Sequence, residues 1–105
     1  MSDGCAIRFD TLPWETVSAH ARQKQFASEG RSVRLLELEE GFCESDWCRR
    51  SHTGYVIEGE LRVQFVDDSV TLKPGDALVL LGGEAGRHKA EVNRGPVMLF
   101  LVETT

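Results

Sequence analysis

Residues 54–61 read GYVIEGEL, and residues 72–78 read LKPGDAL. Between them, residues 61–66 alternate apolar and polar side chains, the pattern of a strand with one face in a core. The Pro-Gly-Asp sequence at 74–76 predicts a tight turn into the apolar run 77–81. This part of the chain is therefore expected to consist of short strands joined by tight turns.

The same pattern continues on both sides. Residues 33–39 scan as a strand after a hairpin turn at 29–31, and residues 87–92 and 97–103 are expected to form two closing strands. Residues 17–27 could be read as a helix, but their apolar positions keep helical spacing poorly. Many short strands with Gly-rich turns predict an all-β sandwich or barrel.

Size and charge limit what such a domain could bind. The 105 residues, with 41% hydrophobic and 28% charged side chains, suit one folded domain with one core. The formal net charge is -5, and no run of Lys and Arg is interleaved with aromatics. We therefore expect neither nucleic acid nor a membrane as a partner.

The N-terminus and the cysteines bear on location. Residues 1–5 start acidic, without the basic and apolar regions of a secretory signal, and no apolar stretch approaches the roughly 20 residues that span a bilayer. Cys5, Cys43 and Cys48 are an odd and dispersed set, which argues against a secreted disulfide framework. The expected location is cytoplasmic.

The two quoted stretches resemble the core of the cupin superfamily, over roughly residues 39–102. The resemblance implies a small double-stranded β-helix, or jelly-roll barrel. It implies one cupin domain over 1–105, with N-terminal strands in 1–40 and the barrel core at about 41–103. It also implies a homodimer that pairs through an edge strand, and exposed sheet edges give a physical motive for that pairing.

The first cupin motif runs His, any residue, His, three or four residues, Glu, six residues, Gly. With its closing glycine at Gly59, His52 takes the place of the Glu, and Cys48 and Asp46 take the places of the two His. The residue types depart from the motif while the spacing survives. The resemblance therefore implies a metal site with altered ligands.

The second motif begins at Gly75 and should reach a histidine. His88 is the candidate, two residues later than the motif expects, with Leu81 where proline is usual. Residues 46–52, DWCRRSH, also resemble a cupin subgroup with an Asp-His-Cys-Trp signature, for which the resemblance implies no settled activity.

The residues themselves support a site inside the barrel. Asp46 and Cys48 would leave the same face of an extended chain, and the parity of His88 with Ala90 turns His88 inward. With His52, they offer ligands for a divalent transition metal such as zinc, iron, nickel or copper. The alternative is that Asp46 caps a turn, Cys48 packs as a small apolar residue, and each His satisfies hydrogen bonds.

Other residues are candidates for contact with a small-molecule ligand. Trp47, Tyr55 and Gln64 could line a pocket, although packing or an exposed strand position would also explain them. Arg49 and Arg50 could recruit an anionic substrate or lie in a solvated loop.

Three functions remain open from the sequence. The first is a metal-dependent enzyme of oxygenase or isomerase type that acts on a small molecule. The second is a non-catalytic barrel that binds or senses a small molecule without metal. The third is a redox responder in which Cys48 is the reactive group.

Overall fold

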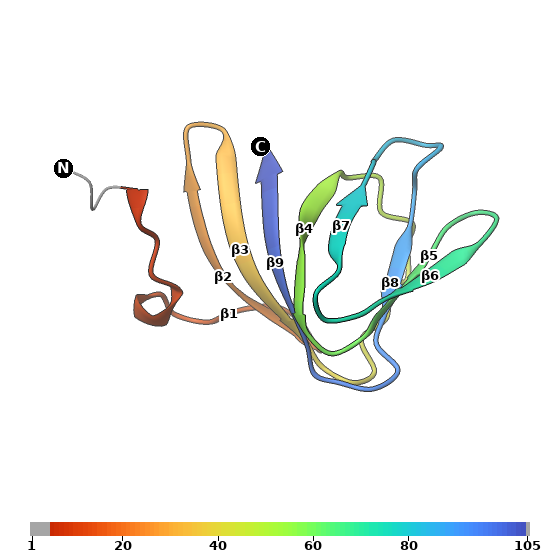
Figure 1. The fold of residues 1–105 in the computed structure, drawn as a ribbon, viewed down its shortest axis with the longest axis horizontal. Coiled ribbons are helices and arrows are strands. Elements are labelled where there is room, and N and C mark those ends of the chain that lie inside the picture. Colours follow the sequence, from red (N-terminus) through yellow and green to blue (C-terminus); the bar gives the residue numbers. More distant parts are fainter. Residues whose placement is uncertain (1–4, 105) are drawn as a thin grey trace.

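The computed structural model describes residues 5–104, which fold into nine strands and a short 3₁₀ turn at Phe9–Thr11 (Figure 1). Residues 1–4, which contributed to the expected cytoplasmic location, lie outside this range. The strands are β1 (Glu15–Ser18), β2 (Ala21–Ser28), β3 (Arg31–Leu38), β4 (His52–Glu58), β5 (Leu61–Gln64), β6 (Ser69–Leu72), β7 (Ala77–Leu80), β8 (Lys89–Glu91) and β9 (Val97–Thr104). The all-β prediction is confirmed, and residues 17–27 contain no helix.

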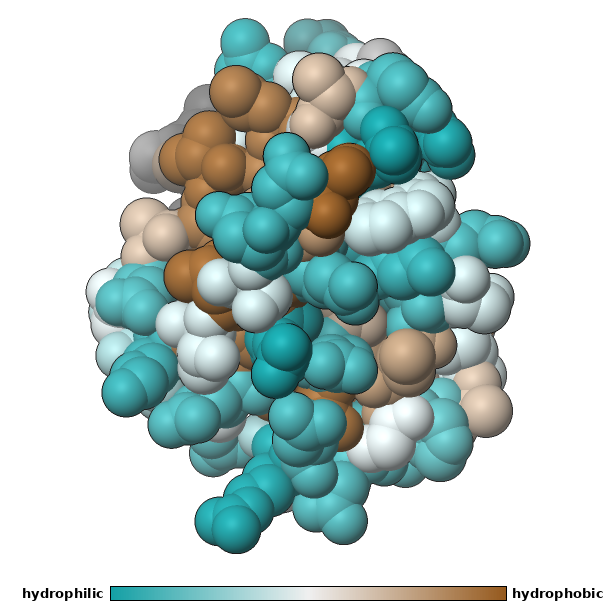
Figure 2. Space-filling view, turned by 90° about the vertical axis from the view of Figure 1, so that its right-hand side faces the viewer, coloured by the Kyte–Doolittle hydropathy of each residue, from teal (hydrophilic) through white to brown (hydrophobic). Residues whose placement is uncertain are grey.

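The strands form two antiparallel sheets. One has six strands in the order β1-β2-β3-β9-β4-β7, and the other has three in the order β6-β5-β8. The last strand, β9, pairs with β3 on one side and β4 on the other, so the N-terminal strands extend the sheet that carries β4. Seen from the end that carries the β5–β6 hairpin, the surface is mostly hydrophilic, with hydrophobic side chains gathered in its upper part (Figure 2).

Alternate side chains of both sheets form the core. In β5, Leu61 and Val63 are buried and the alternating residues Arg62 and Gln64 are exposed, as the period-two pattern predicts. The buried apolar side chains come from both sheets and from the turns next to them: Ala21, Leu38, Val56, Leu61, Val63, Leu78, Val92, Val97, Leu99 and Leu101. Ser32, His88 and Glu103 are buried with them. Two of these three polar residues belong to the site described below. None of the described segments is a helix of the length and apolarity needed to span a bilayer.

Gly54, on the inner face of β4, allows β4 and β9 to approach closely. A Cβ at this position would lie 2.1 Å from the backbone oxygen of Phe100 and 2.8 Å from Leu101 Cδ2. We expect Gly54→Ala to lower the free energy of unfolding by about 2 kcal/mol, because the backbone must move to relieve the clash. Urea unfolding measures this loss. Thr53→Val, at the exposed neighbouring position, should stay within about 0.5 kcal/mol of the parent. Equal stability of the two variants would contradict the account.

Candidate metal centre

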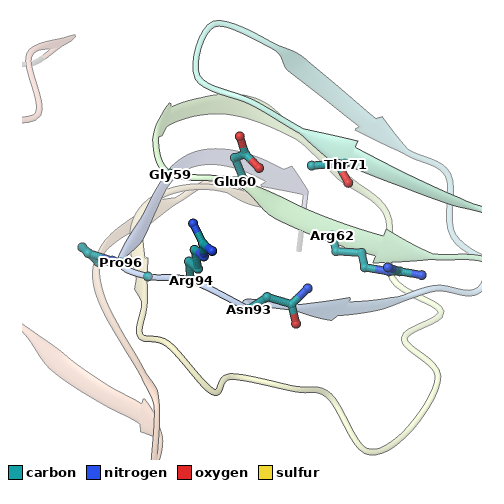
Figure 3. Close-up of a pocket in the computed structure, with 8 residues that line it drawn as sticks. Gly59, Glu60, Arg62, Thr71, Asn93, Arg94 and Pro96 are labelled. Atoms are coloured by element: carbon teal, nitrogen blue, oxygen red, sulfur yellow. The ribbon is translucent and has the colours of Figure 1, made fainter.

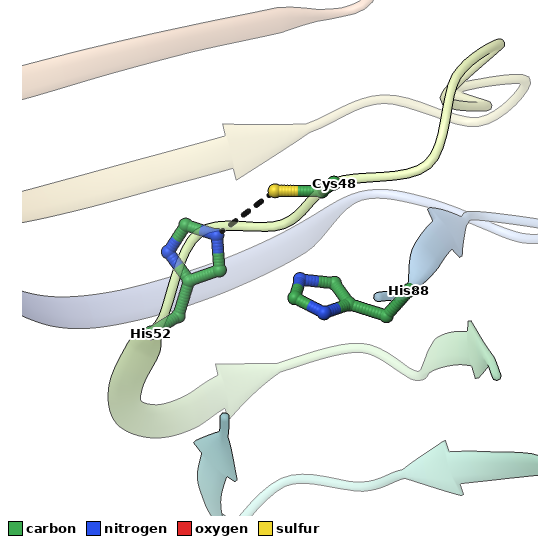
Figure 4. Close-up of side chains that lie close together, drawn as sticks. All are labelled: Cys48, His52 and His88. Carbon is green, nitrogen blue, oxygen red and sulfur yellow. Dashed lines mark hydrogen bonds between the residues drawn. The ribbon is translucent and has the colours of Figure 1, made fainter. Parts of the chain in front are cut away.

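Three potential metal ligands converge between the sheets. Cys48 lies in the connection between β3 and β4, His52 begins β4, and His88 immediately precedes β8 (Figure 4). One ligand atom from each side chain lies within 4.8 Å of the other two. The distance from Cys48 Sγ to His52 Nε2 is 3.6 Å.

Backbone pairing places two of these side chains together. Cys48 and His88 form an isolated antiparallel bridge, in which each N–H donates to the other residue's carbonyl at 2.7 and 3.0 Å. Directly opposed residues of an antiparallel pair project to the same face. His52 reaches that face from β4, on the side of the strand where Val56 is buried. The arrangement thus depends on strand register.

Glu103, on β9, sets the tautomer of His52. Its Oε2 lies 2.5 Å from His52 Nδ1 and accepts a hydrogen bond from Arg34 Nη2 at 2.9 Å. Burial lowers the pKa of His52, against the opposing effect of Glu103. Burial alone would raise the pKa of Glu103, but the hydrogen bond and charge of Arg34, with His52, hold that pKa below its ordinary value. A neutral His52 therefore donates Nδ1–H to an ionised Glu103 and presents the Nε2 lone pair to Cys48.

A backbone carbonyl sets the tautomer of His88, as Glu103 does for His52. The Nδ1 of His88 lies 3.1 Å from the carbonyl oxygen of Gly86 and donates to it. Its Nε2 is buried and has no hydrogen-bond partner among the described residues. Buried polar atoms are rarely left unpaired. An unpaired imidazole lone pair beside a thiol and a second imidazole is what a metal ligand set presents.

The donor atoms suit a transition metal. One sulfur and two imidazole nitrogens are ligands for zinc and its neighbours, whereas magnesium and calcium require oxygen. The 3.6 Å from Cys48 Sγ to His52 Nε2 equals the roughly 3.6 Å that separates sulfur and nitrogen ligands around tetrahedral zinc. Three protein ligands with a further position open is the composition of catalytic rather than structural zinc sites.

The three side chains open onto a cavity of about 320 Å³. Most of its wall is aliphatic or aromatic, and the charged side chains that line it are Arg34, Glu44 and Arg50. Glu44 Oε1 accepts a hydrogen bond from the Ala90 N–H at 2.8 Å. The apolar lining residues are Val17, Ala21, Leu36, Leu38, Phe42, Leu61, Leu78, Leu80, Ala90, Leu99 and Leu101. An apolar chamber with a few convergent polar groups is typical of small-molecule sites.

No protein-family model and no curated protein matches the chain. Solved structures do. An RmlC-like cupin from Shewanella frigidimarina superposes with a TM-score of 0.78 at 16% identity, covering 95% of this chain and 89% of the other. KdgF from Halomonas sp. superposes with a TM-score of 0.72 at 21% sequence identity, covering 89% of this chain and 87% of the other. A sugar phosphate isomerase of a cupin superfamily, from Silicibacter pomeroyi, superposes with a TM-score of 0.75 at 17% sequence identity. The match covers 95% of this chain and 75% of the other.

The chain has the cupin fold. The predicted small barrel is therefore confirmed, while identities this low show the fold alone. The likeness to the Asp-His-Cys-Trp subgroup stays a prediction.

Asp46, the fourth predicted ligand, does not join the cluster. It is exposed, because a bend at Ser45 and Asp46 interrupts the extended chain on which the parity argument relied. Glu44, before the bend, lines the cavity instead. The structure therefore brings together Cys48, His52 and His88 and leaves Asp46 outside.

The three predicted pocket residues also lie outside this cavity. Trp47 packs beneath Arg87 and Lys89, whose charged groups lie 5.5 and 4.9 Å from its ring centroid. Tyr55 is 47% exposed, on the outward parity of β4. Gln64 is exposed on β5. Strand alternation and cation–π packing explain all three positions.

Sequence reasoning missed two charged residues of the candidate site, Glu103 and Arg34. Glu103 shares the inward parity of Leu99 and Leu101 on β9, and Arg34 shares that of Leu36 on β3. A charged residue at an inward position of a strand is the signal that could have identified each of them.

A second hollow lies at the other end of β4 (Figure 3). It measures about 510 Å³ and is lined by Gly59, Glu60, Arg62, Thr71, Asn93, Arg94, Gly95 and Pro96. It contains neither Cys nor His, and Arg62 is paired with Glu91 at 3.1 Å. This polar hollow lacks the ligand chemistry of the first cavity.

Acidification should destabilise the metal-free protein in two steps. The pKa of His52 is below its ordinary 6.5, so the unfolded chain takes up that proton first and stability falls as pH drops below about 6.5. The pKa of Glu103 is below 4.5, so its contribution is lost as pH falls further, below about 4.5. Urea unfolding between about pH 2.5 and 8 measures both steps. His52→Gln should remove the step below pH 6.5, whereas the exposed His20→Gln should keep it; an unchanged step in His52→Gln would refute the assignment.

Proposed function

We propose that this protein is a metal-binding cupin in which Cys48, His52 and His88 hold one divalent transition ion beside a small-molecule cavity. One observation carries the proposal: the buried Nε2 of His88 has no partner and points to the same place as Cys48 Sγ and His52 Nε2 (Figure 4). Zinc, iron, nickel and copper are the candidates by donor type. The alternative of a metal-free binding barrel leaves that buried nitrogen unexplained.

The chain's own residues have definable roles in such a site. A bound divalent ion would supply Lewis acidity and an anchoring point for one ligand atom. Glu103 holds the Nδ1 proton of His52 and so keeps its Nε2 unprotonated, and the Gly86 carbonyl does the same for His88. The aliphatic wall excludes water and strengthens electrostatic interactions inside the cavity. Metal-dependent oxygenase and isomerase reactions are the classes to assay, and a similar structure is itself described as an isomerase.

Elemental analysis tests the proposal. The protein is purified without added metal or chelator, together with His52→Ala and, as a matched control, His20→Ala, whose side chain is exposed outside the cluster. We expect close to one transition ion per chain in the parent and in His20→Ala, and loss of the ion in His52→Ala. Absence of metal from the parent, even after incubation with iron, zinc, nickel and copper, would overturn the proposal in favour of a metal-free binding barrel.

We also propose a cytoplasmic homodimer, and we place its interface on the outer face of the six-stranded sheet instead of at the edge strand that the sequence resemblance implied. The register places Phe26, Val33, Val102, Thr53 and Val79 in one row across the sheet, and Phe26, Val102 and Val79 are more than 40% exposed. Such a row favours burial against a second copy. Light scattering should give about 23 kDa, twice 11.7 kDa.

The row can be tested by adding a charge at its centre. Val102→Lys should yield a monomer, because dimerisation would bury the new charge. Val66→Lys, at an exposed apolar position outside the row, should stay dimeric. A monomeric parent, or a dimeric Val102→Lys, would contradict this interface.

A further inference from the structure

The two adjacent arginines between Cys48 and His52 have different environments. The Arg49 guanidinium is bound to both carboxylate oxygens of Glu84, at 2.8 and 3.1 Å, away from the cavity. Arg50 lines the cavity that the three metal ligands share. It is exposed to solvent at the rim of that cavity, and within residues 5–104 its guanidinium forms no hydrogen bond or ion pair. Of the two, only Arg50 has a guanidinium free to meet a ligand.

The other charges at the cavity are already engaged. Arg34 is paired with Glu103 at 2.9 Å, so that pair adds no net charge. Glu44 is the one carboxylate on the lining, and one of its oxygens accepts the Ala90 N–H. A divalent ion held by the Cys48 thiolate and two neutral imidazoles would add a net charge of about +1. Arg50 at +1 and Glu44 at -1 offset each other in the sum, so the cavity with the ion bound would carry a net charge of about +1.

The rest of the wall selects against a strongly polar ligand. Ten aliphatic side chains from both sheets, seven of them leucines, face the cavity, with Phe42. Its volume of about 320 Å³ is near the small end of the roughly 300–1,000 Å³ range of ligand pockets. Such a chamber accepts a compact hydrocarbon body and leaves Arg50 to bind one anionic group.

From these observations we infer that the ligand of this site is a small aliphatic carboxylate, whose carboxylate is bound by Arg50 and whose hydrocarbon body fills the cavity. The inference rests on the proposed function, because it concerns the ligand of the same site. Arg50 acts here as the residue that determines specificity for the charge of the ligand.

Calorimetric titration with octanoate tests the inference, on the full chain in metal-free and zinc-loaded form. Octan-1-ol and octylamine serve as uncharged and cationic probes with an aliphatic chain of the same length. We expect octanoate to bind more tightly than either. Arg50→Gln should weaken octanoate binding about tenfold, through loss of a charge-assisted hydrogen bond, and leave octanol binding unchanged. Arg49→Gln, the matched control, should leave both unchanged.

Three results would overturn the inference. The first is that octanoate binds no more tightly than octanol in either form, and the second is that octylamine binds more tightly than octanoate. The third is that Arg49→Gln and Arg50→Gln weaken octanoate binding equally. Metal content, measured on the same samples, separates this failure from failure of the proposed function. A protein that takes up no metal yet shows Arg50-dependent octanoate binding would sustain the ligand class and refute the metal centre. A protein that binds zinc but whose octanoate binding does not depend on Arg50 would sustain the metal centre and refute the ligand class.

Discussion

His88→Leu should abolish zinc binding while leaving the stability of the metal-free protein within about 1 kcal/mol of the parent. Leucine has a similar volume and removes the buried, unpaired Nε2, which is favourable. It also removes the hydrogen bond to the Gly86 carbonyl, which is unfavourable by about 1 kcal/mol. The two effects oppose each other in the metal-free state, whereas the loss of one of three ligands affects only the zinc-bound state.

Thermal unfolding with and without zinc measures both effects. At zinc concentrations a hundredfold above Kd, binding should stabilise the parent by about 2.7 kcal/mol, which raises Tm by roughly 10–20 °C in a domain of this size. His88→Leu should lose this rise and keep the Tm of the metal-free parent. His20→Leu, at an exposed position, should keep the rise. A zinc-dependent rise that survives in His88→Leu would show that the ion binds elsewhere.

Glu103→Gln should weaken zinc binding about 10–100-fold and lower the stability of the metal-free protein by about 3 kcal/mol. The affinity falls because glutamine does not fix the Nδ1–H tautomer of His52 as a carboxylate does. The stability falls because Arg34, whose side chain is 15% exposed, loses the partner of its buried charge.

A second variant separates the two effects of Glu103. Arg34→Met combined with Glu103→Gln removes the unpaired charge and should recover most of the stability. The double variant should still bind zinc weakly, because His52 still lacks its carboxylate partner. Competition with a chromophoric chelator measures the zinc affinity, and urea unfolding measures the stability. Zinc affinity that returns to the parent value in the double variant would show that Glu103 acts only through folding.

Most of the strands and the clustering of Cys48, His52 and His88 were predictable because both follow local spacing. Alternation predicted strands at 61–66 and 97–103, which the structure forms at Leu61–Gln64 and Val97–Thr104, and the distance back from Gly59 led to Cys48 and His52. His88 was identified by its parity with Ala90. These signals work because a strand repeats every two residues and its inner face is set by the core.

The rest of the site depends on how distant segments meet. The bend at Asp46 turns one predicted ligand outward, and no spacing rule signals it. Glu103 reaches His52 across 51 residues of sequence, through pairing of β9 with β4. Arg49 and Arg50 are neighbours of one type, and only their contacts distinguish the neutralised one from the one at the cavity. Register and side-chain pairing decided these outcomes.

The most direct test of the metal centre is the absorption spectrum of the protein loaded with cobalt(II), a spectroscopic substitute for zinc, in the parent and in Cys48→Ser. A site that contains the Cys48 thiolate should give a thiolate-to-cobalt charge-transfer band with one equivalent of cobalt, and Cys48→Ser should lose that band. Cys43→Ser, which changes a thiol exposed at the surface, should keep it. A parent spectrum without the charge-transfer band, or a band that persists in Cys48→Ser, would contradict a site built from Cys48, His52 and His88.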